Sequence, residues 1–194
     1  MDFIMSASII SRKFILFTLM LLVSTSSLAG NFKVQSAEIS KIGNGYILDA
    51  TISYPLTPRV KEAISNGVPI TFLQQLELVH SIAIFGKYWQ WDKTLWTTSL
   101  RYELRYHALT EQYVLKALDT EHYRNFPSLD SALTALGTIK EISLPPEHLA
   151  NTDGLIFQIR SGLDLYALPT PMRPGALLSN KWQVTSPWKI ATWP

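Results

Sequence analysis

The chain has no cysteine among its 194 residues. Disulfide bonds, thiol nucleophiles and cysteine-ligated zinc are therefore excluded, and the folded state depends on side-chain packing alone. The sequence also has no phosphate-binding loop, no Gly-x-Ser-x-Gly elbow and no Ser-x-x-Lys pair, which are local signatures of several enzyme classes. We therefore predict no catalytic residues and no cofactor, and only a site assembled from residues far apart in the chain stays open.

A long hydrophobic run is also missing. Residues 14–23 are apolar and uncharged, but serines close the run soon afterwards, whereas a membrane-spanning helix needs about 20 such residues. Arg12 and Lys13 precede the run. An uncleaved membrane anchor is therefore the weaker interpretation of this segment.

The same segment has the features of a cleavable signal peptide. A basic start and a short apolar core are followed by small residues that end at Ala29, and this order is typical of secretory signals. We predict that residues 1–29 are removed by cleavage after Ala29. Residues 30–194 then form one exported domain without a membrane anchor, a length that suits a single core.

The predicted mature chain has little net charge. Loss of Asp2, Arg12 and Lys13 with the signal lowers the seventeen Lys and Arg to fifteen and the fifteen Asp and Glu to fourteen. Neither sign is clustered, whereas a nucleic-acid-binding surface needs a basic patch that neutralises phosphates. The sequence therefore predicts no nucleic-acid partner.

The dominant pattern of the mature chain is the period-two alternation typical of half-buried strands. Apolar and polar residues alternate over 46–54, and Gly43-Asn44-Gly45 before it predicts a turn that pairs this strand with residues 32–42 as a hairpin. Other strands are predicted over residues 70–84, 100–107, 113–115 and 155–165, with an edge strand over 182–184.

Two short helices interrupt the strands. Thr57 followed by Pro58 is typical of a helix start, so a helix is predicted over residues 58–66. Ser128 predicts the cap of a second helix, and Gly137 its C-terminal stop.

These elements predict a mainly β fold. Strands and helices do not alternate regularly, which argues against a parallel α/β sheet. We expect an antiparallel β-sandwich, immunoglobulin-like in general architecture, with two short connecting helices. The proline-rich residues 168–175 are predicted to lie in a loop or at a sheet edge.

The histidines do not indicate a metal site. None lies three or four residues from another, as a helical pair of metal ligands would. Two of them follow a glutamate, but adjacent side chains in a strand point to opposite faces. The four histidines are His80, His107, His122 and His148. We expect His80 to lie in the core and His107 in solvent.

An aromatic block is the first candidate binding site. Trp89 and Trp91 are two residues apart and share a face if the segment is a strand. With Tyr88 and Trp96 they would form a stacking platform for sugar rings or an anchor for a peptide. The alternative is that these aromatics fill the core, as large side chains usually do.

A charged pair is the second candidate. Arg160 and Asp164 are four residues apart on one predicted strand, so they share a face. They would form an ion pair with each other or meet Arg105 across the sheet. The functional interpretation is a recognition site beside the proline-rich segment.

Several blocks, in order, give the chain a wider resemblance. It resembles an exported Gram-negative family known only as a domain of unknown function. Lys87 and Gln90 depart from the family pattern, where arginine and tryptophan are more usual. The matching blocks are residues 63–70, 89–92, 104–113 and 126–133, Arg160 with Leu163-Asp164, residues 168–171, and Trp182 with Ser186-Pro187-Trp188.

The resemblance implies a context but no catalytic residues. Members are often encoded beside a nitrogen-regulation-type sensor kinase, which implies a sensor kinase or another envelope protein as partner. With the predicted signal peptide, the expected location is the periplasm. Our first hypothesis is a non-enzymatic binding or accessory module of the envelope. The alternative is an envelope hydrolase or carbohydrate-binding protein that acts on cell-wall polymer. The candidate binding residues are Trp89, Trp91, Arg105, Arg160 and Asp164.

Overall fold

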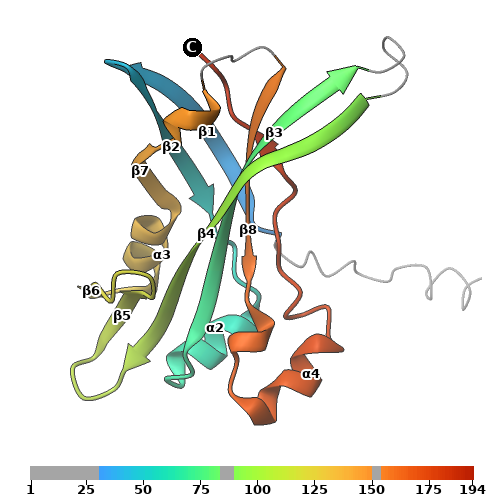
Figure 1. Ribbon diagram of the computed structural model, residues 1–194. Helices are drawn as coiled ribbons and strands as arrows, with labels where there is room; N and C mark the ends of the chain where they lie inside the picture. The colour runs from blue at the N-terminus through green and yellow to red at the C-terminus, as the bar shows by residue number, and fades with distance from the viewer. Residues whose placement is uncertain (1–30, 84–89, 150–153) are drawn as a thin grey trace, which may run out of the picture.

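The computed structural model describes residues 31–83, 90–149 and 154–194. Figure 1 shows strands arranged in two groups, with short helices at the lower end and at one side. The strands are β1 (Lys33–Ile42), β2 (Gly45–Ser53), β3 (Ile70–Ala83), β4 (Gln90–His107), β5 (Gln112–Ala117), β6 (Tyr123–Phe126), β7 (Thr138–Ser143), β8 (Leu155–Leu163) and β9 (Lys189–Ile190). The helices are α2 (Pro58–Ser65), α3 (Leu129–Gly137) and α4 (Arg173–Leu177), with 3-10 turns at Pro146–His148, Leu165–Ala167 and Thr170–Met172.

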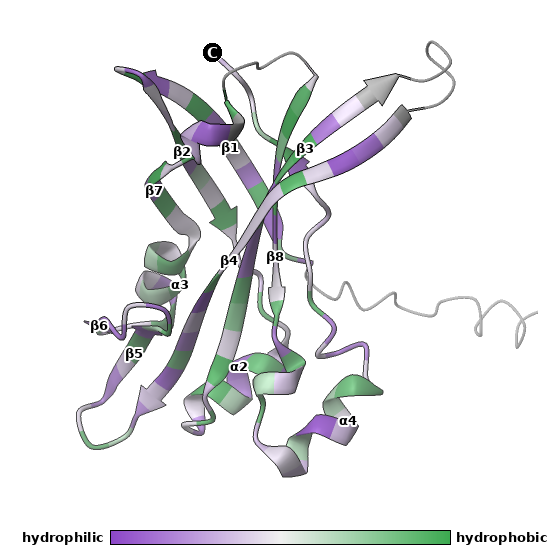
Figure 2. Cartoon of the chain, in the orientation of Figure 1, coloured by the Kyte–Doolittle hydropathy of each residue, from purple (hydrophilic) through white to green (hydrophobic). Residues whose placement is uncertain are grey.

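The strands form two antiparallel sheets. The smaller has the order β1-β2-β7 and the larger the order β6-β5-β4-β3-β8-β9. This arrangement confirms the predicted mainly β, antiparallel fold; the immunoglobulin-like sandwich stays a prediction. Figure 2 shows hydrophilic and hydrophobic residues alternating along β1 and β2, as expected for strands with one buried face.

The first hairpin forms as predicted. Ile42 of β1 pairs with Gly45 of β2 across a two-residue turn, and Gly43 takes a φ of 57°. Glycine adopts this left-handed backbone without the steric cost that a Cβ imposes. The alternation of the sequence therefore determined both the pairing and the buried face.

The β3–β4 hairpin is longer than its sequence pattern predicts. β4 begins at Gln90 instead of residue 100. It pairs with the whole length of β3, from Ile70 opposite Leu104 to Ala83 opposite Gln90. The register shifts once, because Leu95 is an extra residue between the pairs Leu78–Trp96 and Val79–Thr94. This β-bulge breaks the period-two pattern, which explains why the first half of the strand could not be recognised. Figure 1 shows the hairpin extending diagonally past the neighbouring strands.

The C-terminal tail joins the two sheets. The amide of Ile39 in β1 donates to the carbonyl of Thr192 (2.8 Å), and the amide of Thr192 donates to the carbonyl of Ala37 (2.9 Å). The preceding amide, that of Ala191, donates to the carbonyl of Phe157 in β8 (2.8 Å). One extended segment thus forms backbone hydrogen bonds with both sheets and closes the seam between them.

Helix α3 packs against both sheets, touching β2 and β7 of the smaller and β5 and β6 of the larger. The side chain of Ser128 accepts the amide of Ser131 as an N-cap (3.2 Å), as predicted. Gly137 ends the helix without a positive φ. Its importance is the close approach of the helix end to β2, where a Cβ would overlap the carbonyl oxygen of Ile52.

Two sequence predictions near the C-terminus are wrong. Residues 182–184 form no strand; a single bridge joins Thr185 to Gly162, and β9 follows later. Residues 168–175 contain a 3-10 turn and most of α4 instead of a plain loop. Prolines are compatible with the first turn of a helix because the amides there lack a helical partner in any case.

A polar cluster lies inside the hydrophobic core. Gln74 is fully buried, and its Nε2 donates to the Tyr54 hydroxyl (2.9 Å) and to the Leu136 carbonyl (2.9 Å). Ser161 donates its hydroxyl proton to the Leu73 carbonyl (3.0 Å), so the Tyr54 hydroxyl is the donor in its 3.1 Å contact with Ser161. This directional chain links β3, β8, α3 and the end of β2 from within.

Candidate functional site

The outer face of β3 and β8 carries a row of paired polar side chains. The residues that alternate with them, such as Phe157 and Ile159, are buried, so this row points away from the core. The register places Gln75 opposite Arg160 and Glu77 opposite Gln158. Gln158 Nε2 donates to Glu77 Oε2 at 3.1 Å.

Arg160 is held in place from two sides. Its Nε donates to Gln75 Oε1 at 2.7 Å, and its guanidinium carbon lies 4.3 Å from the centroid of the Trp188 ring. A guanidinium over an indole face is attracted by the ring quadrupole. The contact immobilises the side chain while its terminal nitrogens keep their N–H donors. The three residues, Gln75, Arg160 and Trp188, are called the arginine–tryptophan site below.

Asp164 does not join this site. Its carboxylate caps the 3-10 turn Leu165–Ala167 by accepting the amides of Tyr166 (3.1 Å) and Ala167 (3.3 Å). Within the described ranges, the ion pairs are those of Arg59 with Glu62 and Lys116 with Glu121. The ion pair expected between Arg160 and Asp164 is therefore not formed.

Arg105 also lies away from the arginine–tryptophan site. It is exposed on β4, opposite Val114 of β5. Gln75 is opposite Ser99 of β4, six residues before Arg105. At about 3.4 Å per residue, Arg105 is about 20 Å further along the sheet, so the predicted meeting with Arg160 across the sheet is not observed.

The aromatic block is divided. Trp91 is 61% exposed on β4, whereas Trp96 is half-buried with its ring 6.4 Å from that of Phe157. Trp96 therefore belongs to the core and Trp91 to the surface. Trp89, Tyr88 and Lys87 lie outside the described residues.

The histidines occupy separate places. His80 is half-buried on β3 beside Gly154, and His107 shares a 3.1 Å hydrogen bond with Thr110 in the β4–β5 turn. His80 is thus less buried than the core position expected for it, and His107 is less exposed than the solvent position expected for it. Among the described residues, no hydrogen bond or ion pair joins a histidine to a carboxylate, and no three candidate ligands cluster as a metal site would require.

A basic cleft of about 520 Å³ opens between α3, β7 and the larger sheet. Arg124 and Lys140 supply its two charged side chains, and Tyr102 and Thr138 supply hydroxyls. Ala135, Ile139 and Ile142 complete the lining. The arrangement offers several hydrogen-bond donors to one ligand.

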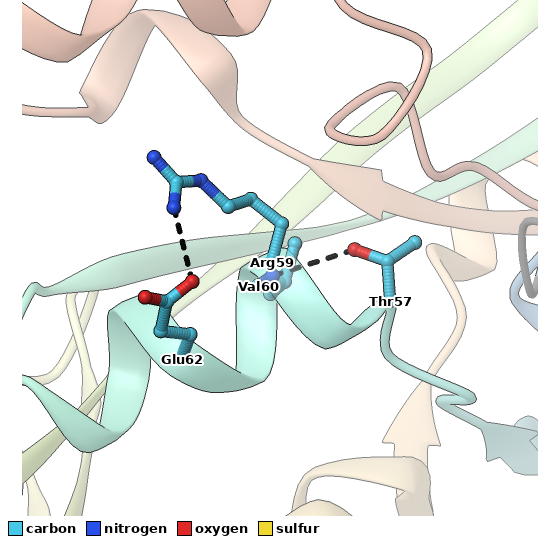
Figure 3. A network of polar contacts seen from close by, with 4 residues as sticks. All are labelled: Thr57, Arg59, Val60 and Glu62. Carbon is cyan, nitrogen blue, oxygen red and sulfur yellow. Dashed lines mark hydrogen bonds and ion pairs between the residues drawn. The ribbon is translucent and has the colours of Figure 1, made fainter.

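A second groove of about 570 Å³ lies between α2 and α4, with Arg59 and Lys181 among its lining residues. Figure 3 shows how the start of α2 is arranged: Thr57 accepts the Val60 amide (3.4 Å), and Arg59 pairs with Glu62 (3.0 Å). The positive charge of Arg59 is thus already balanced within the helix.

Sequence reasoning identified Arg160 but missed the residues that hold it. Trp188 belongs to a block that was recognised only as part of the resemblance, and 28 positions separate it from Arg160. Arg124 and Lys140 lie in β6 and β7, two strands that the alternation did not predict. An outward Arg on a strand was the only signal available, and such residues are usually just solvated.

Comparison with known proteins adds a family. A sequence model described as "Domain of unknown function (DUF4390)" matches residues 29–192. Neither the curated proteins nor the solved structures contain a significant match. Within the described ranges, no helix combines the length and the apolar character that a membrane span requires.

Proposed function

We propose that the chain, which belongs to the DUF4390 family, is a non-enzymatic binding module of the bacterial periplasm. The family is described as a domain of unknown function, so the choice of binding site is argued from the residues of this chain. Its partner is an envelope protein, the ectodomain of a sensor kinase in the first instance. Support for the kinase comes from the resemblance, which implies such a gene neighbour.

The arginine–tryptophan site is the observation that carries this proposal. Arg and Trp dominate the energetics of protein interfaces, and here one Arg is already ordered by Gln75 (2.7 Å) and Trp188 (4.3 Å). Ordering a long side chain before binding removes an entropy cost from association. The free N–H donors of Arg160 suit a carboxylate or a backbone carbonyl of the partner.

The test is capture of the sensor-kinase ectodomain by the purified protein. Arg160→Ala removes the donor fork, and Trp188→Ala removes the surface that orders it, so we expect each to weaken capture at least about tenfold. Arg101→Ala is the control, because Arg101 is an arginine of the same sheet that is exposed on β4, opposite Leu73, and is not one of the residues that form the arginine–tryptophan site. Equal capture by Arg160→Ala and wild type would disprove the site. In affinity purification of the protein from the periplasm, recovery of glycan without any protein would disprove the partner class.

A second candidate function is carbohydrate binding through Trp91, because an indole that is 61% exposed can stack on a sugar ring. In that case Trp91→Ala abolishes retention of the protein on cell-wall polymer and leaves kinase capture unchanged. The hydrolase alternative would be favoured instead by turnover of the polymer that one His or Glu substitution abolishes.

Export is the part of the proposal that a single measurement tests. The family match begins at residue 29, which supports the interpretation of the preceding segment as a signal peptide. We expect the mature protein to begin at Gly30 and to fractionate with the periplasm. Ala29→Arg should block cleavage, because signal peptidase requires a small residue there, and mass spectrometry should then show the full-length precursor. A wild-type protein that keeps residues 1–29 would contradict cleavage.

A further inference from the structure

The lining of the basic cleft favours a negatively charged ligand. Arg124 and Lys140 both line it, and no acidic residue does. Asp130 lines the opening on the β2 side of α3. In the α2–α4 groove Arg59 is paired with Glu62, which leaves Lys181 as its one lining cation outside the ion pairs of the described residues. The basic cleft thus combines two positive charges with no lining acid.

A β-bulge brings Lys140 to the cleft. Ala50 pairs with Ile139 and Leu48 with Ile142, so two residues of β7, Lys140 and Glu141, lie opposite the single residue Asp49. Glu141 takes a φ of 57°, and its amide donates to Asp49 Oδ1 at 2.8 Å. Bulges re-aim side chains and recur beside functional sites. Here the bulge lets Lys140 line the cleft together with Ile139, while Glu141 is not among the lining residues.

Arg124 is oriented by an aromatic neighbour. Its guanidinium carbon lies 5.1 Å from the centroid of Phe126, two residues along β6, which restrains the long side chain. Neither Arg124 nor Lys140 belongs to the ion pairs of the described residues. Both charges are therefore available to a ligand.

The hydroxyl groups complete the set of polar contacts. The hydroxyl of Tyr102 is protonated at neutral pH, and burial, followed by the charge of Asp119, raises its pKa further from its usual value. Thr138 donates its proton to the Thr134 carbonyl (2.8 Å), which leaves its oxygen as an acceptor. The cleft thus presents two cations, a phenolic hydroxyl that can donate or accept, and a threonine hydroxyl that can only accept.

We propose that this cleft binds an organic anion that carries a phosphate or carboxylate group, with Arg124 and Lys140 as its charged contacts. A guanidinium fork matches both groups bidentately, and an ammonium adds a point charge. A volume of about 520 Å³ is within the usual range for small-molecule sites. The inference is independent of the arginine–tryptophan site, so the two can fail separately.

Calorimetric titration of the purified protein with citrate and with inorganic phosphate tests the proposal. We expect saturable binding that Arg124→Gln and Lys140→Gln each weaken about tenfold. Arg59→Gln and Lys33→Gln are the controls, because they remove the same charge outside the cleft. Both test residues are polar and lie on strands β6 and β7 near the surface, so circular dichroism should show an unchanged fold.

A parallel measurement on lipid vesicles distinguishes two sources of the anion, a free anion in solution and a lipid headgroup. Binding to phosphatidylglycerol vesicles but not to phosphatidylcholine vesicles, lost in Arg124→Gln, supports the site and identifies a lipid headgroup as its ligand. The absence of binding to citrate, phosphate and anionic vesicles tighter than about 10 mM overturns the proposal. Equal loss in the Arg59→Gln control also overturns it, because attraction is then only to net charge.

Discussion

Gly137→Ala is expected to destabilise the protein by about 3 kcal/mol, a large fraction of the roughly 5–15 kcal/mol that stabilises a typical domain. An added Cβ at the end of α3 overlaps the carbonyl oxygen of Ile52 in β2. The obstacle is backbone in a paired strand, so no side-chain rotation relieves it. The helix must move away from β2, and the contacts of α3 with both sheets are then strained.

Urea denaturation followed by circular dichroism measures this effect, with Gly175→Ala as the control. Gly175 is also helical, but its added Cβ meets nothing within 4 Å. That substitution should raise stability by about 0.4–1 kcal/mol, because alanine lowers the entropy of the unfolded chain. An unchanged midpoint for Gly137→Ala would show that α3 does not approach β2 as closely as described.

The second large effect is a loss of stability at alkaline pH. Burial is the main cause that raises the pKa of Tyr54 from 10.0 to about 12. Because the folded-state pKa exceeds the unfolded one, the stabilisation is complete below pH 10 and is lost as the pH rises from 10 to about 12. At about 1.36 kcal/mol per pKa unit, the loss is about 3 kcal/mol.

Comparison with Tyr54→Phe isolates this contribution from the titration of surface groups. The variant lacks the ionising hydroxyl, so its free energy of unfolding should fall less steeply between pH 10 and 12. It should be about 1–3 kcal/mol less stable at pH 8, because Gln74 and Ser161 each lose a buried partner. Identical pH profiles for both proteins would mean that the Tyr54 hydroxyl is accessible to water.

Local signals account for the parts of the fold that the sequence predicts. The alternation over β2, the Gly43 turn and the caps at Thr57 and Ser128 each depend on neighbouring residues, and the structure contains all of them. The short strand β6 is missed because its residues are exposed or half-exposed, so they show no alternation of buried and exposed positions. The first half of β4 is missed because the bulge at Leu95 changes the phase of its pattern.

The candidate site was predicted in part for a related reason. Arg160 stands out on its strand, but only the path of the C-terminal tail brings Trp188 over it. Gln75 faces Arg160 through the register of β3 and β8, which no local pattern specifies. Lys140 depends on a bulge, and nothing in its immediate sequence announces one. The sequence shows the types of these residues, but it does not show which distant residues the fold brings together.

The hydrogen bonds of Thr192 to β1 have a consequence for the order of folding. They connect Ala37 and Ile39 to a residue about 150 positions later, so their formation requires closure of a very long loop, which is slow. Since Thr192 follows the strands of both sheets in the chain, these bonds form late and fix the relative position of two sheets that helix α3 already contacts.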